Sequence, residues 1–248
     1  MTDQSTSHSP DINAAGLTGT APDALRYDGH DDDPAEVAGM LRAIMPASAK
    51  VLDIGCGTGS VTLIANRGKN NRVLAIEPDP ERAAVAASRD IDVRCGLVDD
   101  AFLRANGPFD VIMLSDVLEH LAAPTDMLAT IRAALSPDGA ALISVPNVAH
   151  WSVRLNLLFG RFDYADVGIM DATHLRWFTA RTIRELFERN GFRLEAFGMT
   201  AGATLPVYAR APFRWVPARL RAGSIRLLTR LLPNLFGCQF VLRARRIG

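Results

Sequence analysis

The amino-acid sequence predicts an α/β fold: a Rossmann-like, doubly wound sheet of seven mostly parallel strands with helices on both faces. Two observations predict this class. Short apolar runs rich in branched side chains alternate along the chain with longer segments of helical periodicity. Strands that alternate with helices of this length form βαβ units, whose sheet is parallel and covered on both faces. A chain of 248 residues is long enough to bury a core of this kind.

The predicted strands are apolar runs that end at turn residues. KVLDI at 50–54 is followed at once by glycines, and FDVIMLS at 109–115 is the strongest run. The segment at 92–96 is the weakest, because charged residues interrupt it. The seven predicted strands cover residues 50–54, 72–77, 92–96, 109–115, 140–147, 193–199 and 238–245.

The predicted helices are bounded by capping residues. The helix over 79–90 has Pro80 near its first turn, and the helix over 179–192 begins at Thr179 and ends at Gly191. The helix over 124–139 is amphipathic and ends in a Pro-Asp-Gly turn. The four predicted helices cover residues 60–68, 79–90, 124–139 and 179–192.

Composition and charge limit the class of protein. The net charge is zero, so we expect no nucleic-acid partner. The three cysteines lie far apart with no CxxC pair, so we expect neither a disulfide framework nor a metal site. Without a secretory signal or an apolar run of about 18–20 residues, a cytoplasmic location is expected. The sequence leaves the oligomeric state open.

The acidic N-terminal segment is expected to be disordered. Residues 1–36 carry eight acidic side chains and one basic side chain, with few large apolar groups. Such a composition cannot bury enough apolar surface to fold. We therefore predict a disordered tail over 1–33 and a single domain over 34–248.

Two insertions are expected in this domain. Residues 146–178 are rich in aromatic and leucine side chains, so they predict a cap or lid over the substrate; packing on the sheet edge is the alternative. Residues 201–236 form a basic amphipathic segment. On a helix, Arg219, Arg226 and Arg230 share one face, and three apolar residues lie opposite: Ile225, Leu228 and Leu232.

Three roles fit this basic segment. The favoured one is a core-packed helix with a solvated basic face. The others are peripheral membrane contact through 215–232 and recognition of a phosphorylated acceptor.

The stretch VLDIGCGTGS at 51–60 predicts a nucleoside-binding crevice. Its glycines follow the first strand, and ligands of such sheets bind beyond the carboxyl ends of the strands. Glu77 ends the second strand, where an acidic group accepts ribose hydroxyls. Ser60 and Val61 after the last glycine exclude a Walker loop, and the G-x-G-x-G spacing differs from the dinucleotide fingerprint. The carboxylate of Asp53 beside the loop favours a cationic nucleoside, S-adenosylmethionine.

Four segments, VLDIGCGTGS, VLAIEPD, FDVIMLSDVLEHL and LSPDGAALISVPN, resemble the class I S-adenosylmethionine-dependent methyltransferases in order and spacing. The resemblance covers about residues 35–200. The stretch from Asn147 to Thr179 is similar to a bacterial branch associated with methylation of sugars, polysaccharides and small metabolites.

The resemblance implies a set of cofactor contacts. Glycine backbone would approach the methionine and ribose, Asp53 would face the cationic end, and Glu77 would hold the ribose hydroxyls. Leu97 stands where the family often has an aspartate for the adenine amino group, so Asp99 is the candidate for that contact. The full set of expected cofactor residues is Asp53, Gly55, Cys56, Gly57, Gly59, Glu77, Pro78, Asp99, Ser115 and Asp116.

Methylation of a hydroxyl needs a group that removes its proton, and histidine is the usual one. The candidates, in order, are His174, His150 and His120. Each also has a purely structural explanation as a hydrogen-bonded loop or helix-start residue. The sequence therefore favours O-methylation of a sugar, glycan precursor or other small metabolite. The alternative is a non-catalytic nucleoside-binding or interaction protein with the same fold.

Overall fold

A computed structural model describes residue 25, residues 28–30 and residues 32–247. Its centre is a seven-stranded sheet in the order β3-β2-β1-β4-β5-β7-β6, in which β7 alone runs antiparallel to its neighbours. The predicted fold class is confirmed. The strands are β1 Lys50–Ile54, β2 Arg72–Glu77, β3 Asp92–Cys95, β4 Phe109–Ser115, β5 Leu135–Pro146, β6 Phe192–Met199 and β7 Gln239–Arg246.

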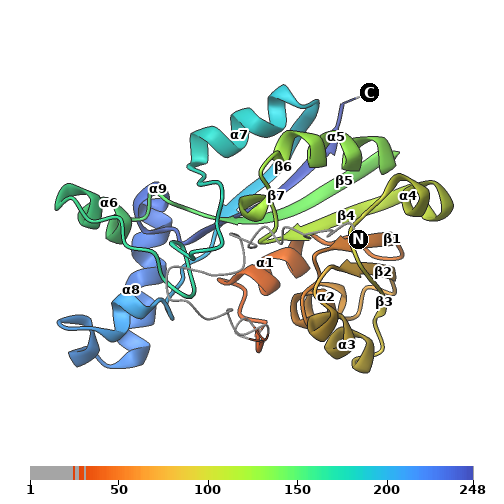
Figure 1. Cartoon of the computed structure of the whole chain (residues 1–248). Coiled ribbons are helices and arrows are strands. Elements are labelled where there is room, and N and C mark those ends of the chain that lie inside the picture. Colours follow the sequence, from red (N-terminus) through yellow and green to blue (C-terminus); the bar gives the residue numbers. More distant parts are fainter. Residues whose placement is uncertain (1–24, 26–27, 31, 248) are drawn as a thin grey trace, which may run out of the picture.

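Helices cover both faces of this sheet (Figure 1). Strand alternation divides the core: Leu52 and Ile54 pack with α4, α5 and α7, whereas Val51 packs with α1 and α2. The helices are α1 Val37–Ile44, α2 Ser60–Asn66, α3 Pro80–Ser88, α4 Asp100–Asn106, α5 Pro124–Ala134, α6 Trp151–Leu158, α7 Ala180–Arg189, α8 Ala218–Leu231 and α9 Pro233–Phe236.

The order of the strands reverses between β1 and β4. From β1 the chain goes outward to β2 and β3, then returns to β4 on the other side of β1. In open parallel sheets a ligand crevice lies at such a reversal, outside the carboxyl ends of the strands. The topology therefore places the residues that follow β1 and β4 at one crevice.

Several boundaries differ from the sequence predictions. The helix predicted to reach residue 139 ends at Ala134, and the chain enters β5 at Leu135. Leu135 pairs with Phe109 of β4 before a register shift. The predicted Pro-Asp-Gly turn therefore lies within the first part of β5. The segment after β4 forms a 3₁₀ turn, Leu118–His120, instead of the start of a helix.

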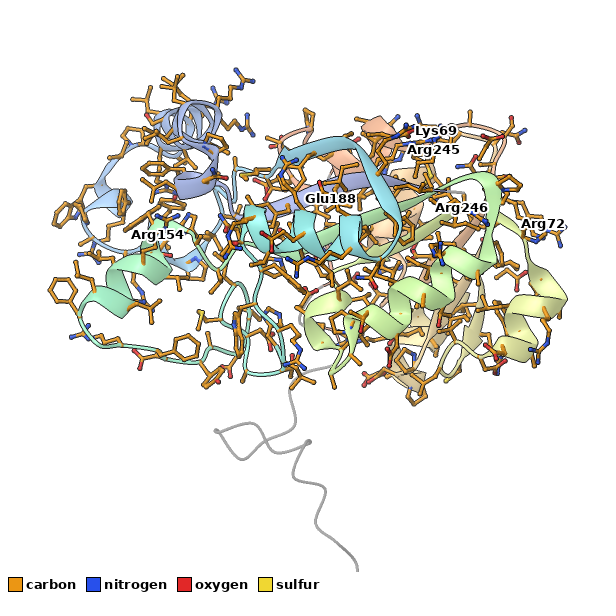
Figure 2. The ribbon with its side chains drawn as sticks, turned by 90° about the horizontal axis from the view of Figure 1, so that it is seen from above. Lys69, Arg72, Arg154, Glu188, Arg245 and Arg246 are labelled. Carbon is orange, nitrogen blue, oxygen red and sulfur yellow. The ribbon has the colours of Figure 1, made fainter. Side chains whose placement is uncertain are left out.

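The first insertion is closed at its base by a bridge between Asn147 and Phe178, close to the predicted limits. It contains α6, which, like α8, lies beyond the end of the sheet (Figure 1). In Figure 2, Arg154 of α6 and Arg72, which begins β2, lie at opposite ends of the molecule. The insertions therefore extend from the carboxyl ends of the parallel strands, where the crevice lies.

The second insertion departs from the predicted helix faces. Ile225 is buried, but Arg226 forms an ion pair with Asp33 and is not part of a solvated stripe. A line of leucines on α8 faces outward: Leu220, Leu227 and Leu231 are 65%, 55% and 66% exposed. Within residues 32–247 and the few described before them, no helix combines the length and apolarity needed to cross a membrane.

Part of the predicted disordered tail packs against the domain. Asp28 accepts hydrogen bonds from Arg89 (2.8 Å) and from the hydroxyl of Thr58 (2.7 Å), and these bonds hold the pKa of Asp28 below its usual range. His30 contacts Ser60 through its backbone N–H, 3.1 Å from Oγ. The expected boundary at residue 33 thus differs from the structure, while residues 1–24 lie outside the described part of the chain.

Candidate functional site

A cavity of about 890 Å³ opens at the carboxyl ends of β1, β2 and β4. This volume is near the upper end of the range of about 300–1,000 Å³ for small-molecule sites. It has room for two ligands side by side. The residues expected from the sequence that line it are Asp53, Gly55, Cys56, Gly57, Glu77, Pro78, Ser115, Asp116, His120 and His174.

The glycine loop forms one wall of the cavity. Gly57 has φ +57°, and a Cβ added there would meet nothing within 4 Å, so its backbone is open to a ligand. Gly59 is different: a Cβ there would lie 2.1 Å from the side chain of Ile91, and Gly59 is not among the lining residues. Gly59 therefore allows α2 to pack closely against α3, a correction to its expected cofactor contact.

Glu77 ties the glycine loop to the end of β2. Its side chain is 3% exposed, and its two carboxylate oxygens accept the backbone N–H groups of Gly57 (2.8 Å) and Asp79 (3.0 Å). A carboxylate oxygen has two acceptor positions, so each oxygen keeps one for a ligand hydroxyl. Glu77 thus has a structural role that sequence reasoning missed.

Asp53 is a buried carboxylate at the bottom of the cavity. Its Oδ2 accepts the Thr62 hydroxyl at 2.6 Å, and its Oδ1 has no hydrogen-bond partner among the described residues. Burial raises the pKa of Asp53 to about 7, and the negative charge of Glu77 adds to the shift. A cationic ligand group at Oδ1 would stabilise the ionised carboxylate and lower the pKa of Asp53 again.

Asp116 is held in an unusual backbone conformation beside the cavity. Its φ is +55°, and its N–H donates to the backbone oxygen of Ser144 (3.1 Å) and to Ser144 Oγ (3.0 Å). Its carboxylate accepts the side-chain amide of Gln239 at 2.8 Å. Burial raises the pKa of Asp116 to about 6. Strained residues fixed by several bonds are frequent at binding sites.

Asp99 does not line the cavity. Its carboxylate caps α4 through the N–H of Phe102 (2.7 Å) and forms an ion pair with Arg94. The lining residues on this side are Gly96, Leu97 and Val98. Asp99 thus lies away from the cavity, whose wall on this side includes Leu97, the residue that departs from the family pattern.

His150 also lies outside the cavity. It is fully buried, and its Nδ1 is 2.8 Å from Ser152 Oγ at the start of α6. Its Nε2 is 3.4 Å from the Tyr208 hydroxyl. Burial lowers the pKa of His150 to about 4. His150 is therefore separated from His120 and His174, which both line the cavity.

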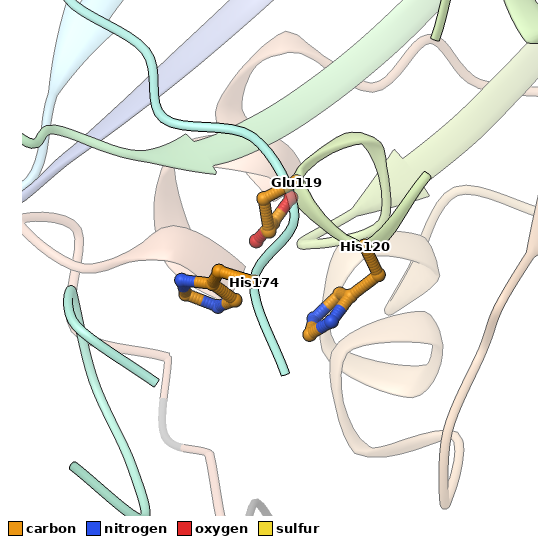
Figure 3. A group of neighbouring side chains, drawn as sticks. All are labelled: Glu119, His120 and His174. Atoms are coloured by element: carbon orange, nitrogen blue, oxygen red, sulfur yellow. The ribbon is translucent and has the colours of Figure 1, made fainter. Parts of the chain in front are cut away.

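His120 and His174 meet in the cavity although they are far apart in the sequence (Figure 3). Their ring centroids are 4.9 Å apart, and Glu119 joins them, with one ligand-type atom of each residue within 4.8 Å of the others. The backbone N–H groups of Leu175 and Arg176 both donate to the Glu119 carbonyl, at 2.8 and 2.9 Å. These two hydrogen bonds to the 3₁₀ turn fix the loop that carries His174 beside Glu119.

Glu119 is the least expected member of this cluster. It is 1% exposed, and neither carboxylate oxygen has a hydrogen-bond partner in the part of the chain that the structure describes. Burial raises the pKa of Glu119, and the nearby charge of Asp116 contributes further. In the sequence, only the adjacent Glu-His pair in DVLEHL indicated Glu119. The cluster itself could not be seen there, because His174 follows 54 residues after His120.

The fold, the cavity and its glycine loop define a Rossmann-like enzyme that binds a nucleoside cofactor at the carboxyl edge of its sheet. Residues 31–196 match the family described as "Methyltransferase domain", and the chain belongs to this family.

Relatives of known function include bacterial methyltransferases. The ubiquinone biosynthesis O-methyltransferase of Xanthomonas axonopodis pv. citri (strain 306) is 30% identical over 125 residues, which cover 48% of this chain and 52% of the relative. That of Xanthomonas oryzae pv. oryzae (strain PXO99A) is 33% identical over 108 residues, 41% of this chain and 44% of the relative. The match therefore spans about half the length of these relatives.

Solved structures share the fold. A SAM-dependent methyltransferase from Archaeoglobus fulgidus has a TM-score of 0.54 and 20% identity, covering 85% of this chain and 95% of that chain. The Burkholderia thailandensis 1,6-didemethyltoxoflavin-N1-methyltransferase, which contains S-adenosylhomocysteine, has a TM-score of 0.53 and 23% identity, covering 89% and 80%.

S-adenosylmethionine is the cofactor of this class of enzyme, and the cavity fits it. The open backbone at Gly57 offers a close approach, and the unpaired Oδ1 of Asp53 offers a place for a cationic group. Glu77 keeps acceptor positions for hydroxyls. When bound, this cofactor supplies an activated methyl group.

Proposed function

We propose that this methyltransferase transfers the methyl group to a hydroxyl of a small molecule. The observation that carries the proposal is one cavity lined by two groups of residues suited to different tasks. The glycine loop, Asp53 and Glu77 line it, and so do Glu119, His120 and His174, which form a cluster. The O-methyltransferase relatives support the choice of oxygen as the acceptor atom.

The chain's own residues would act mainly by orientation and proton control. Methyl transfer requires the acceptor atom in line with the methyl group, and a closed cavity supplies that alignment. Gly168, Ile169 and His174 of the first insertion line the cavity, so the insertion would cover the acceptor. His174 or His120 would accept the proton of the acceptor hydroxyl through a direct hydrogen bond.

The acceptor class expected from the sequence is a sugar, a glycan precursor or another small metabolite. A phenol belongs to the last group, and the names of the relatives state O-methylation in ubiquinone biosynthesis. The wide cavity and its apolar lining residues, such as Leu121 and Met127, favour an acceptor with an apolar portion.

The alternative is a non-catalytic nucleoside-binding protein. The buried, unpaired carboxylate of Glu119 argues against it, because an isolated buried polar group costs about 1–3 kcal/mol or more. Cofactor binding through the glycine loop, Asp53 and Glu77 gives no reason to keep that cost at Glu119.

Turnover of S-adenosylmethionine tests the proposal. Purified protein would be incubated with catechols, phenols, sugars and nucleotide sugars, and S-adenosylhomocysteine and the methylated product would be measured by mass spectrometry. The proposal expects an O-methyl product from at least one class. Tight cofactor binding without turnover on any of them, or a product methylated on nitrogen or carbon, would contradict it.

We also propose that the enzyme is cytoplasmic and touches an anionic membrane surface through residues 215–232. The outward line of leucines on α8 lies near exposed Trp215 and the exposed arginines Arg219 and Arg230. Apolar side chains flanked by arginines suit a surface of acyl chains and negative head groups. Such contact would give access to an acceptor dissolved in the membrane.

A further inference from the structure

The cluster of Glu119, His120 and His174 in the cavity has the composition of a metal centre. Glu119 offers a carboxylate oxygen, and His120 and His174 each offer a ring nitrogen, all within 4.8 Å of one another. A metal ion with tetrahedral bonds of about 2.0–2.2 Å keeps its ligand atoms about 3.3–3.6 Å apart. Side-chain movements of about one ångström would therefore bring the three ligand atoms around an ion.

Hydrogen bonds orient both imidazoles for this purpose. His174 Nδ1 lies 3.1 Å from the Ile169 carbonyl oxygen, and His120 Nδ1 lies 3.3 Å from the Thr173 carbonyl oxygen. A carbonyl only accepts, so a neutral imidazole in either position would carry its proton on Nδ1 and its lone pair on Nε2. Metal-binding histidines usually donate their other nitrogen in this way.

Asp171 fixes Thr173, the residue whose carbonyl oxygen lies beside His120 Nδ1. The Thr173 hydroxyl donates to Asp171 Oδ1 at 2.6 Å, and the Thr173 N–H donates to the same oxygen at 2.8 Å. Asp171 is fully buried. A carboxylate that fixes the support of a ligating histidine is the arrangement expected around a metal site.

The carboxylate of Glu119 supplies the independent sign of a missing ligand. It is 1% exposed, it points toward the two imidazoles (Figure 3), and both its oxygens lack a hydrogen-bond partner within the described ranges. Buried charges are normally paired or coordinate a metal. A cation at the cluster would compensate this carboxylate.

We propose that Glu119, His120 and His174 bind one divalent transition-metal ion, such as Zn²⁺, Mn²⁺ or Co²⁺. Two imidazoles and one carboxylate suit this class of ion, and three protein ligands leave positions open for a substrate oxygen. The site faces the cavity that holds the glycine loop, so an acceptor hydroxyl can occupy an open position.

The role in catalysis rests on the proposed function. Binding of the acceptor oxygen to the ion lowers the pKa of the hydroxyl, and its proton passes to water. The oxygen then forms a bond to the methyl carbon while the carbon–sulfur bond breaks, and its electron pair stays on sulfur. The products are a methyl ether, S-adenosylhomocysteine and one proton.

Co²⁺ titration of the metal-free protein tests the site without turnover. Visible absorption bands of bound Co²⁺ report coordination by imidazole, and Zn²⁺ displacement with elemental analysis gives the stoichiometry. We expect one ion per wild-type chain and loss of binding in His120→Ala, His174→Ala and Glu119→Ala. Thr173→Val, which removes only the supporting hydroxyl, should weaken binding about 10–100-fold.

His30→Gln is the matched control, because His30 lines the same cavity but lies outside the cluster. It should bind Co²⁺ like the wild type, and calorimetry with S-adenosylmethionine shows that each variant is folded. If the wild type does not bind Co²⁺, the metal site is overturned. Equal Co²⁺ binding by His174→Ala and the wild type also overturns it. Full turnover in the presence of a chelator that removes the ion overturns the catalytic role of the ion and assigns the histidines to proton transfer.

These outcomes are independent of the proposed function. If the protein binds Co²⁺ but methylates no hydroxyl, the metal site stands and the acceptor class fails. If it methylates a hydroxyl without binding Co²⁺ or Zn²⁺, the acceptor class stands and the metal site fails.

Discussion

The carboxyl group of Asp53 makes cofactor affinity depend on pH. Its pKa is raised to about 7 because it is buried, so below that pH the cofactor-free protein holds a proton there. A sulfonium or ammonium group beside Oδ1 favours the carboxylate, so binding releases this proton. We expect the affinity for S-adenosylmethionine to rise with pH, by up to about tenfold per unit, and to level off above about pH 7.

Calorimetry in two buffers of different ionisation enthalpy at pH 6 measures the released proton. Asp53→Asn should remove most of the release, while Asp116, whose pKa is about 6, remains as a smaller source. The stability of the cofactor-free protein should fall as pH rises from about 4 to 7, because the folded state holds the proton more tightly than the unfolded chain. An affinity independent of pH between 5.5 and 8 would argue against the role of Asp53.

Glu77 gives the second prediction for a single side chain. Glu77→Ala leaves the N–H groups of Gly57 and Asp79 without their acceptor, and it removes the expected ribose contact. Cofactor binding should weaken by about 1–3 kcal/mol. Glu77→Gln keeps one acceptor oxygen and should lose less. Equal affinity of the alanine variant and the wild type, measured by calorimetry, would show that the ligand does not use Glu77.

The strands and the long capped helices could be predicted from sequence because local signals specify them. FDVIMLS became β4, and Thr179 caps α7 through the N–H of Thr182. The short helices α1 and α4 were missed. The helix α1 has no side-chain cap and is stabilised by burial of residues such as Val37 and Leu41. The helix α4 is capped by Asp99, a signal that the sequence analysis assigned to the cofactor instead. The meeting of Glu119 with His174 could not be predicted, because it depends on two hydrogen bonds between segments 56 and 57 residues apart.

The helix α8 gives a prediction for one element. Leu220, Leu227 and Leu231 are exposed, so a triple change to Gln should leave folding intact and reduce binding to vesicles of anionic lipid. Arg219→Gln with Arg230→Gln should also reduce binding and lower its dependence on salt. Vesicle sedimentation measures both effects.

The matched control lies on α7. Arg181→Gln with Arg189→Gln removes the same charge from two exposed arginines on another helix. This variant should sediment with vesicles like the wild type. Equal loss in the α7 and α8 variants would mean that net charge alone causes binding, and no binding of the wild type would leave α8 as a solvated helix.

For the whole molecule, the N-terminal segment is linked to the cofactor side of the cavity. Asp28 joins Arg89 and Thr58, and both Asp28 and His30 line the cavity. A chain that begins at residue 34 should therefore bind S-adenosylmethionine a few-fold more weakly, as expected for a partly exposed ion pair worth up to about 1 kcal/mol. A chain that begins at residue 25 keeps these contacts and serves as the control. Equal affinity of the two shortened chains would contradict the link.

The two N–H groups that meet the Glu119 carbonyl determine where the cavity can open. They hold residues 175 and 176 against the turn after β4, so this end of the insertion is fixed in position. Beyond this anchor the insertion lines the cavity through Val167, Gly168 and Ile169, and we expect an entering acceptor to pass there. Leu158 and Phe159, earlier in the insertion, are 78% and 70% exposed. In hydrogen exchange, the amides of Leu175 and Arg176 should be protected far longer than those of residues 159–164. The size of the molecule admitted to the cavity would then be set by the part of the insertion whose amides exchange faster.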